Sequence, residues 1–286
     1  MINVAVIGIG RFGRSLLKSF DEKVSVVAAS STGNFENIEK TKILSSNIRF
    51  IDNEEIACDK KIDAVVIASP IQELYNLSKL FIKSGKHVFL EKPGAINSDQ
   101  LKHLRSMLKK DQILYVDYLL TLDPAYLRLK NVLNGSKIDE IKMFWDKRGS
   151  LKPDILLNLF CHELSIIHDL FDDKAIHIEK SDVNNENCEI QMKIKNIKIN
   201  SLIVRTAPKY DKRVYVKTEN NVYLWDKKTT SLFLNGSCIF SENNFDYNDL
   251  INTSRDKFLR MISQKERNEK NLSLSIKVLE TIEKIK

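Results

Sequence analysis

Apolar positions along the chain follow two rhythms, and the first fills the N-terminal part. Short apolar runs rich in β-branched residues occur at 2–7, 24–29, 62–68, 87–90 and 113–116. Stretches with helical spacing separate them, most clearly at 72–84 and 98–110. Buried strands that alternate with helices are typical of a parallel sheet covered on both faces. Residues 1–120 are therefore predicted to form a doubly wound α/β domain of the Rossmann type.

A second rhythm begins after Tyr118. Period-two alternation with short polar turns marks the segments 188–194, 197–205, 213–218, 222–225 and 231–234. Helical spacing marks 124–133, 154–170, 247–263 and 268–285, and a strand-like stretch covers 138–148. Residues 121–286 are therefore predicted to form an α+β domain. Its sheet should be open and mainly antiparallel, with helices on one face.

The first predicted strand leads directly into the motif Gly8-x-Gly10-x-x-Gly13. In a dinucleotide-binding turn, the first glycine permits the tight turn, the second lets the backbone approach a pyrophosphate, and the third lets the helix lie close to the strand. The N-terminus of the following helix favours phosphate groups. A glycine-rich turn without a ligand is the alternative, but the strand before the motif and the helix after it favour nucleotide binding. The predicted cofactor-binding stretch is Gly8, Ile9, Gly10, Arg11, Phe12 and Gly13.

The ends of the other predicted strands supply further candidates. Ligands of doubly wound sheets bind beyond the carboxyl ends of the strands. We therefore expect the cofactor crevice to include these residues: Ser30, Ser31, Thr32, Ser69, Pro70, Glu91, Lys92 and Pro93.

The end of the second strand bears on the choice between NAD and NADP. Dinucleotide folds usually place an acid there on the ribose 2′-hydroxyl, whereas this chain has Ser30, Ser31 and Thr32. Without a carboxylate, a 2′-phosphate meets no repulsion, which slightly favours NADP. A hydroxyl-rich loop that binds NAD through Ser30 or Ser31 is the alternative.

Composition and charge narrow the class of protein. The 286 residues are 43% hydrophobic and 29% charged, which is ordinary for a globular protein. There is no long apolar span, so we expect no membrane segment and a cytoplasmic location. The net charge of +7 comes from basic residues interleaved with acids, which argues against a nucleic-acid partner. The four cysteines have no CxxC spacing, so reduced thiols are favoured over disulfides or a metal site.

Several stretches together resemble the Gfo/Idh/MocA oxidoreductases, a family named for glucose–fructose oxidoreductase and inositol dehydrogenase. They are 6–13 with the glycine motif, 85–93 with Glu91-Lys92-Pro93, 123–126 at the entry to the second domain, and 272–280 in the last helix. The resemblance covers nearly the whole length, and Glu-Lys-Pro after a strand is its most specific part. It implies a second domain for substrate binding and, commonly, a homo-oligomer.

By this resemblance, Lys92 lies beside the nicotinamide and the substrate. The chemistry is reasonable on its own, because an ammonium group can protonate or hydrogen-bond a carbonyl that gains a hydride. A surface lysine is the alternative. Pro93 fixes the turn, in the family often through a cis bond. At the junction of the domains, Tyr118 can hydrogen-bond substrate, with a core tyrosine as the competing interpretation.

The family's Asp-x-x-x-His motif aligns with Asn158 and His162. Asparagine orients a hydroxyl but accepts no proton, so the predicted catalytic residues are Lys92 and His162, with Asn158 positioning substrate. His168, six positions further along, is expected to be structural.

These observations predict an NAD(P)-dependent oxidoreductase that acts on a carbonyl or secondary alcohol of a sugar or sugar nucleotide. An enzyme similar to biliverdin reductase is one alternative, although such proteins tend to lack the lysine found here as Lys92. A dinucleotide-binding sensor or partner subunit without catalysis is the other, because the aspartate position holds Asn158.

Overall fold

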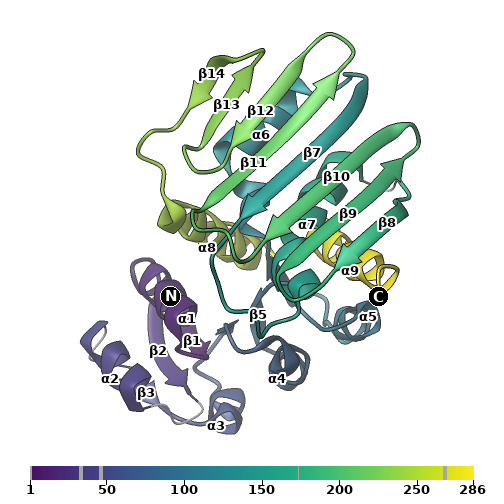
Figure 1. Cartoon of the computed structure of the whole chain (residues 1–286). Coiled ribbons are helices and arrows are strands. Elements are labelled where there is room, and N and C mark those ends of the chain that lie inside the picture. Colours follow the sequence, from purple (N-terminus) through teal and green to yellow (C-terminus); the bar gives the residue numbers. More distant parts are fainter. Residues whose placement is uncertain (1, 32–34, 45–47, 173, 267–268) are drawn as a thin grey trace. The chain divides into compact units, whose positions relative to one another are not determined.

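The computed structural model describes residues 2–31, 35–44, 48–172, 174–266 and 269–286. The chain divides into two compact units. One consists of Met1–Tyr118 with Tyr247–Ile276, and the other of Leu119–Asp246 with Lys277–Lys286. Figure 1 shows the helices and strands of both.

The first unit is built on a parallel sheet in the order β3-β2-β1-β4-β5-β6. This is the strand order of a dinucleotide-binding Rossmann fold. Its strands within the described residues are β1 (Asn3–Ile7), β2 (Ser25–Ser30), β3 (Arg49–Phe50), β4 (Ala64–Ile67), β5 (His87–Glu91) and β6 (Leu114–Asp117). The helices between them are α1 (Arg11–Asp21), α2 (Phe35–Leu44), α3 (Asn53–Cys58), α4 (Ile71–Lys83) and α5 (Ser98–Ser106). Strand β4 is apolar and fully buried, which explains why its sequence shows no alternation.

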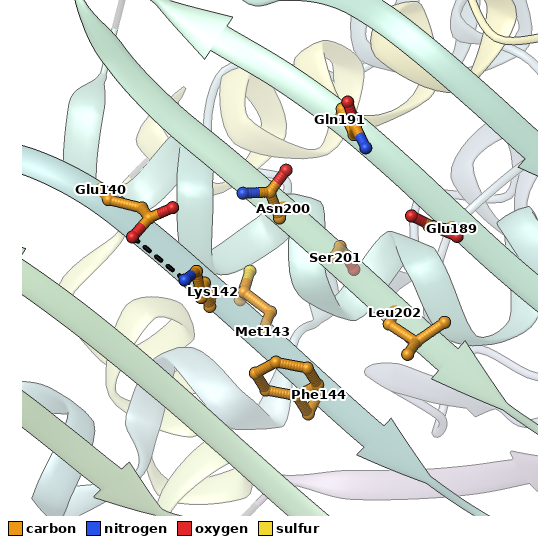
Figure 2. Close-up of a pocket in the computed structure, with 9 residues that line it drawn as sticks. All are labelled: Glu140, Lys142, Met143, Phe144, Glu189, Gln191, Asn200, Ser201 and Leu202. Atoms are coloured by element: carbon orange, nitrogen blue, oxygen red, sulfur yellow. Dashed lines mark ion pairs between the residues drawn. The ribbon is translucent and has the colours of Figure 1, made fainter.

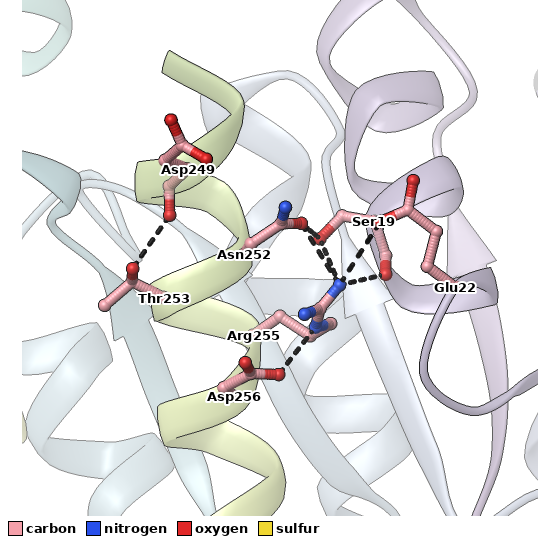
Figure 3. A network of polar contacts seen from close by, with 7 residues as sticks. All are labelled: Ser19, Glu22, Asp249, Asn252, Thr253, Arg255 and Asp256. Atoms are coloured by element: carbon pink, nitrogen blue, oxygen red, sulfur yellow. Dashed lines mark hydrogen bonds and ion pairs between the residues drawn. The ribbon is translucent and has the colours of Figure 1, made fainter. Parts of the chain in front are cut away.

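A helix from the far end of the sequence, α8 (Tyr247–Gln264), also belongs to the first unit. The buried Arg255 guanidinium donates to the carbonyl of Ser19 on α1 and to the Asn252 side chain, as Figure 3 shows. Beside it, Phe258 packs edge-to-face against Phe20 and Phe89. The division therefore differs from the predicted boundary, which assigned all of 121–286 to the second domain. The physical reason is that α8 buries its apolar face on the first sheet.

The second unit is built on a sheet in the order β14-β13-β12-β11-β7-β10-β9-β8. Neighbouring strands are antiparallel except β10 and β7, which are parallel. The strands are β7 (Ile138–Asp146), β8 (His177–Val183), β9 (Asn187–Ile194), β10 (Ile197–Val204), β11 (Asp211–Thr218), β12 (Val222–Asp226), β13 (Ser231–Leu234) and β14 (Ser237–Ser241). Helices α6 (Pro124–Val132) and α7 (Cys161–Phe171) lie on one face (Figure 1). The predicted α/β class, with a parallel and a mainly antiparallel sheet, is confirmed.

The last helix, α9 (Glu269–Glu283), runs through the division between the units, with Lys277 the first residue in the second. No helix in the described parts of the chain is both long and apolar enough to span a bilayer. Within the same residues, no cluster of three histidine, cysteine or acidic side chains is arranged to hold a metal ion.

Candidate active site

The glycine motif forms the turn between β1 and α1, and its three glycines differ in their surroundings. Gly8 has a φ of +85°, a conformation that side chains rarely tolerate. A Cβ on Gly13 would lie 1.8 Å from the Gly8 carbonyl oxygen. A Cβ on Gly10 would meet no atom within 4 Å. Two glycines are therefore required by the fold itself, and Gly10 is bare toward open space.

The N-terminus of α1 is suited to an anion. Gly10 is the N-cap and offers no side-chain cap, and the first turn contains no acidic residue. The first N–H groups of a helix have no acceptor within the helix, and its dipole favours negative charge there. Arg11 at this end is exposed, and Ile9 is buried beneath the turn. The residues present therefore fit the pyrophosphate of a dinucleotide.

The end of β2 carries the serines predicted to lie near the ribose. The Ser30 hydroxyl donates to Asn53 Oδ1 at 2.6 Å, and its carbonyl accepts from the Gly8 N–H at 3.1 Å. Ser31 is half-buried, and Thr32 lies outside the described residues. The Ser30 carbonyl thus supports the glycine turn, while its hydroxyl is engaged by Asn53 at the start of α3. The choice between NAD and NADP stays a prediction.

The ends of β4 and β5 bring the next candidates to the same edge of the sheet. Ile7, Ile67 and Leu90 are aligned on three adjacent strands. The residues just beyond these positions therefore follow one another along that edge: Gly8, Ser69, Pro70, Glu91, Lys92 and Pro93. Lys92 is half-buried, and the Lys92–Pro93 peptide bond is cis. The first unit thus places the primary amine of Lys92 at the same edge of the sheet as the glycine turn. Its role in catalysis stays a prediction.

Glu91 was among the sequence candidates, but the acid paired with it on the next strand, Asp117, was not. Glu91 at the end of β5 is the register partner of Asp117 at the end of β6. Asp117 is buried, and its Oδ1 accepts a hydrogen bond from Ser254 of α8 at 2.6 Å. Burial raises the pKa of Glu91 to about 7, and burial beside the Glu91 charge raises the pKa of Asp117. A carboxyl that exchanges a proton near neutral pH therefore adjoins Lys92 in the chain.

In the second unit, Asn158 and His162 come from one continuous helical segment. A π-helical turn over Leu156–Phe160 runs into α7, and the Asp154 carboxylate caps it by accepting the N–H groups of Leu156 and Leu157. Asn158 and His162 are both half-buried, and their spacing places them on the same side of the helix. The structure therefore presents the amide and the imidazole together.

Two other polar residues of α7 have structural partners. The Ser165 hydroxyl donates to the carbonyl of His162 at 2.7 Å. His168 is buried, and its Nε2 lies 2.9 Å from the Thr281 hydroxyl of α9. Tyr118 is almost fully buried in the first unit, which matches the core interpretation more closely than a substrate contact. Its predicted substrate role stays a prediction.

The burial of His168 makes the stability of the second unit depend on pH. Desolvation lowers the pKa of His168 to about 4, from an ordinary value of 6.5. Between these values the unfolded chain binds the proton and the folded chain does not, so stability falls as the pH drops from 6.5 toward 4. The expected loss is about 3 kcal/mol. The free energy of unfolding is measured by urea titration at pH 7 and pH 4. It should differ less between the two pH values in His168→Gln than in the unmodified chain. Equal differences would contradict the assignment.

The chain is similar to known proteins in both sequence and fold. A family model, GFO_IDH_MocA, described as an oxidoreductase family with an NAD-binding Rossmann fold, matches residues 2–118. This part of the chain is thus similar to the NAD-binding domain of that oxidoreductase family. The resemblance predicted from the sequence is thereby confirmed.

A curated relative is the inositol 2-dehydrogenase/D-chiro-inositol 3-dehydrogenase of Shouchella clausii strain KSM-K16. It is 24% identical over 192 residues, which cover 62% of this chain and 55% of the relative. The chain thus spans about half the length of that relative.

Solved structures of similar fold extend over both units. A dehydrogenase (MviM) from Clostridium difficile has a TM-score of 0.86 at 19% identity, and the match covers 99% of this chain and 98% of that one. UDP-N-acetylglucosamine 3-dehydrogenase GnnA from Acidithiobacillus ferrooxidans has a TM-score of 0.85 at 15% identity, with 99% and 96% covered. At these identities the likeness establishes the shared fold. The second unit therefore shares its fold with these structures as the first unit does.

Proposed function

We propose that this protein is an NAD(P)-dependent oxidoreductase that transfers a hydride between nicotinamide and a carbonyl or secondary alcohol. The observation that carries the proposal is the edge of the first sheet. There the bare Gly10 follows β1 at a helix N-terminus and Lys92 follows β5, two parallel strands that are separated only by β4 and end at the same edge of the sheet. A dinucleotide held at Gly8–Gly13 supplies or accepts the hydride.

The protein's own residues would manage the proton and the substrate. The Lys92 ammonium donates a proton or a hydrogen bond to the carbonyl oxygen that becomes an alcohol, and stabilises the alkoxide in the reverse direction. His162 is the second acid–base group. Asn158 holds a substrate hydroxyl through its amide, because an amide has both donors and an acceptor but takes no proton.

We propose a sugar, a cyclic polyol or a sugar nucleotide as the substrate. Support comes from the inositol substrate in the name of the Shouchella clausii relative and the sugar nucleotide in the name of the structurally similar GnnA. The amide of Asn158 and the imidazole of His162 suit a ligand with adjacent hydroxyl groups. The absence of an acid at the end of β2 slightly favours NADP as the cofactor.

A substrate screen tests the proposed function. The purified protein is mixed with each oxidised or reduced cofactor and a panel of inositols, sugars and sugar nucleotides, and the absorbance of reduced nicotinamide is followed. Turnover with at least one compound is expected. Biliverdin is included, since reduction of the pigment alone would favour the other enzyme class. Cofactor binding with no turnover of any compound would favour a sensor.

We further propose a homo-oligomer formed through the open face of the second sheet. A hollow of about 470 Å³ lies on this face over β7, β9 and β10. Figure 2 shows residues of these strands that line it. The ion pair of Glu140 with Lys142 lies beside Phe144, which is 40% exposed. The mixture of both charge signs with an apolar ring suits a self-complementary contact.

The oligomer is tested by light scattering on the full chain. A mass corresponding to two or more copies is expected for the unmodified protein. Phe144→Glu should lower that mass. Leu127 on α6 is similarly exposed, so Leu127→Glu is the matched control and should leave the mass unchanged. A monomer at micromolar concentration would contradict this part of the proposal.

A further inference from the structure

The second unit contains a buried ion pair that the proposed chemistry does not use. Lys212 of β11 donates to Glu163 of α7, and each residue is only 1% exposed. Glu163 directly follows His162 in the chain. Apolar residues of similar size often serve stability as well as a buried pair does. The presence of this pair next to His162 therefore calls for an explanation other than stability.

The ammonium of Lys212 also contacts an aromatic ring. Lys212 and Trp145 are register partners on the adjacent strands β11 and β7. The Lys212 Nζ lies 3.4 Å from the centroid of the Trp145 ring, which is a close cation–π contact in a desolvated setting. Trp145 is itself buried. The lysine thus holds the indole ring while Glu163 holds the lysine.

The same indole ring contacts the imidazole of His162. The two ring centroids are 5.6 Å apart, and the rings meet edge-to-face at 69°. Edge-to-face pairs of this separation have a preferred geometry, so the position of one ring restricts that of the other. A continuous series of contacts therefore leads from Glu163 through Lys212 and Trp145 to His162.

We propose that Lys212, anchored by Glu163, is a positioning residue that fixes Trp145 and thereby the ring of His162. This inference rests on the proposed function for the importance of His162, and it specifies how that site is held. In this proposal His162 contacts the substrate, and Lys212 does not. The second cation over Trp145 is Lys147, at 5.3 Å from the ring centroid and partly exposed. It provides a natural control.

Several charged or titratable groups surround the cluster and enter the design of its test. Glu163 and Cys161 come from α7, and Lys227 lies near Lys212. Desolvation lowers the pKa of Lys212, while the carboxylate of Glu163 opposes that change. Removing only one partner would leave a buried charge. The informative variant therefore removes both charges as Glu163→Leu with Lys212→Met.

Tryptophan fluorescence of the full chain reads the geometry without any substrate. The chain has two tryptophans, so Trp225→Phe leaves Trp145 as the reporter. A protonated imidazole in contact with an indole quenches its emission. The Trp145 emission should therefore fall on acidification, and His162→Asn should abolish this fall. Should Trp225→Phe fold poorly, the same change is measured as the difference between the unmodified chain and His162→Asn.

The double variant should fold and yet lose at least half of the quenching amplitude, with kcat/KM reduced at least tenfold if the enzyme is active. Lys147→Met should retain both. Full amplitude in the folded double variant, or an equal loss in Lys147→Met, would overturn the proposal. A chain that transfers no hydride but shows the His162-dependent quenching, lost in the double variant, would refute the proposed function and support the positioning.

Discussion

Lys92→Ala is expected to lower turnover at least ~100-fold, which is the usual contribution of a positioned general acid. The reason is that Lys92 lies just beyond the end of β5, at the same edge of the sheet as the proposed dinucleotide-binding turn. Steady-state kinetics with the substrate found in the screen provide the measurement. The affinity for the dinucleotide, measured by fluorescence titration, should stay nearly unchanged, since the glycine turn is intact.

A matched lysine separates this effect from a general loss of charge. Lys83 is exposed in the last turn of α4 in the same unit. Lys83→Ala should keep full turnover. If Lys92→Ala also kept it, Lys92 would be a surface lysine, and the assignment of the acid would be refuted.

Gly13→Ala is expected to lose stability, whereas Gly10→Ala is expected to keep its stability and lose affinity for the dinucleotide. A Cβ at Gly13 would lie 1.8 Å from a backbone oxygen, so the turn must open. The free energy of unfolding of the first unit should therefore fall by more than about 3 kcal/mol. At Gly10 the Cβ meets no protein atom within 4 Å, and φ is −63°, which alanine adopts readily. Gly10→Ala should therefore fold within about 0.5 kcal/mol of the unmodified chain.

The difference at Gly10 appears only with ligand. A methyl group at the N-cap of α1 stands where the pyrophosphate must approach, so Gly10→Ala should weaken dinucleotide binding at least about tenfold, or roughly 1.4 kcal/mol. Urea unfolding and cofactor titration on both variants measure the two effects. Unchanged affinity in Gly10→Ala would place the dinucleotide elsewhere.

The sequence anticipates the elements whose burial leaves a periodic pattern. The fully buried β4 and the alternating β9 both lie within one or two residues of their predicted bounds. The strand β8 was not predicted, because it is an exposed edge strand with mixed polar residues. The strand β14 was also not predicted, because it is short and almost wholly exposed, so burial leaves no pattern in its sequence. Asn235 and Gly236 form the turn between β13 and β14, and both have positive φ. An Asn-Gly pair is typical of a tight hairpin and could have marked this strand.

Long-range contacts account for what sequence reasoning missed. The assignment of α8 depends on Arg255 reaching Ser19, more than two hundred residues away, which no local pattern shows. The same holds for Asp117, whose strand-end position was visible but whose partner Ser254 was not. Lys212 and Trp145 likewise meet only through the pairing of β11 with β7. The positions of Gly13 in its turn and of Lys92 at a strand end could be predicted, because the motifs that mark them are local in the sequence.

Hydride transfer at the edge of the first sheet can be followed atom by atom. The most direct measurement supplies nicotinamide cofactor deuterated at C4, in the transferable position, with the keto form of the best substrate, and locates the label by mass spectrometry. The account predicts deuterium on the carbinol carbon of the product, with the yield reduced at least ~100-fold in Lys92→Ala. Bound cofactor that transfers no deuterium to any sugar, polyol or sugar nucleotide would contradict it.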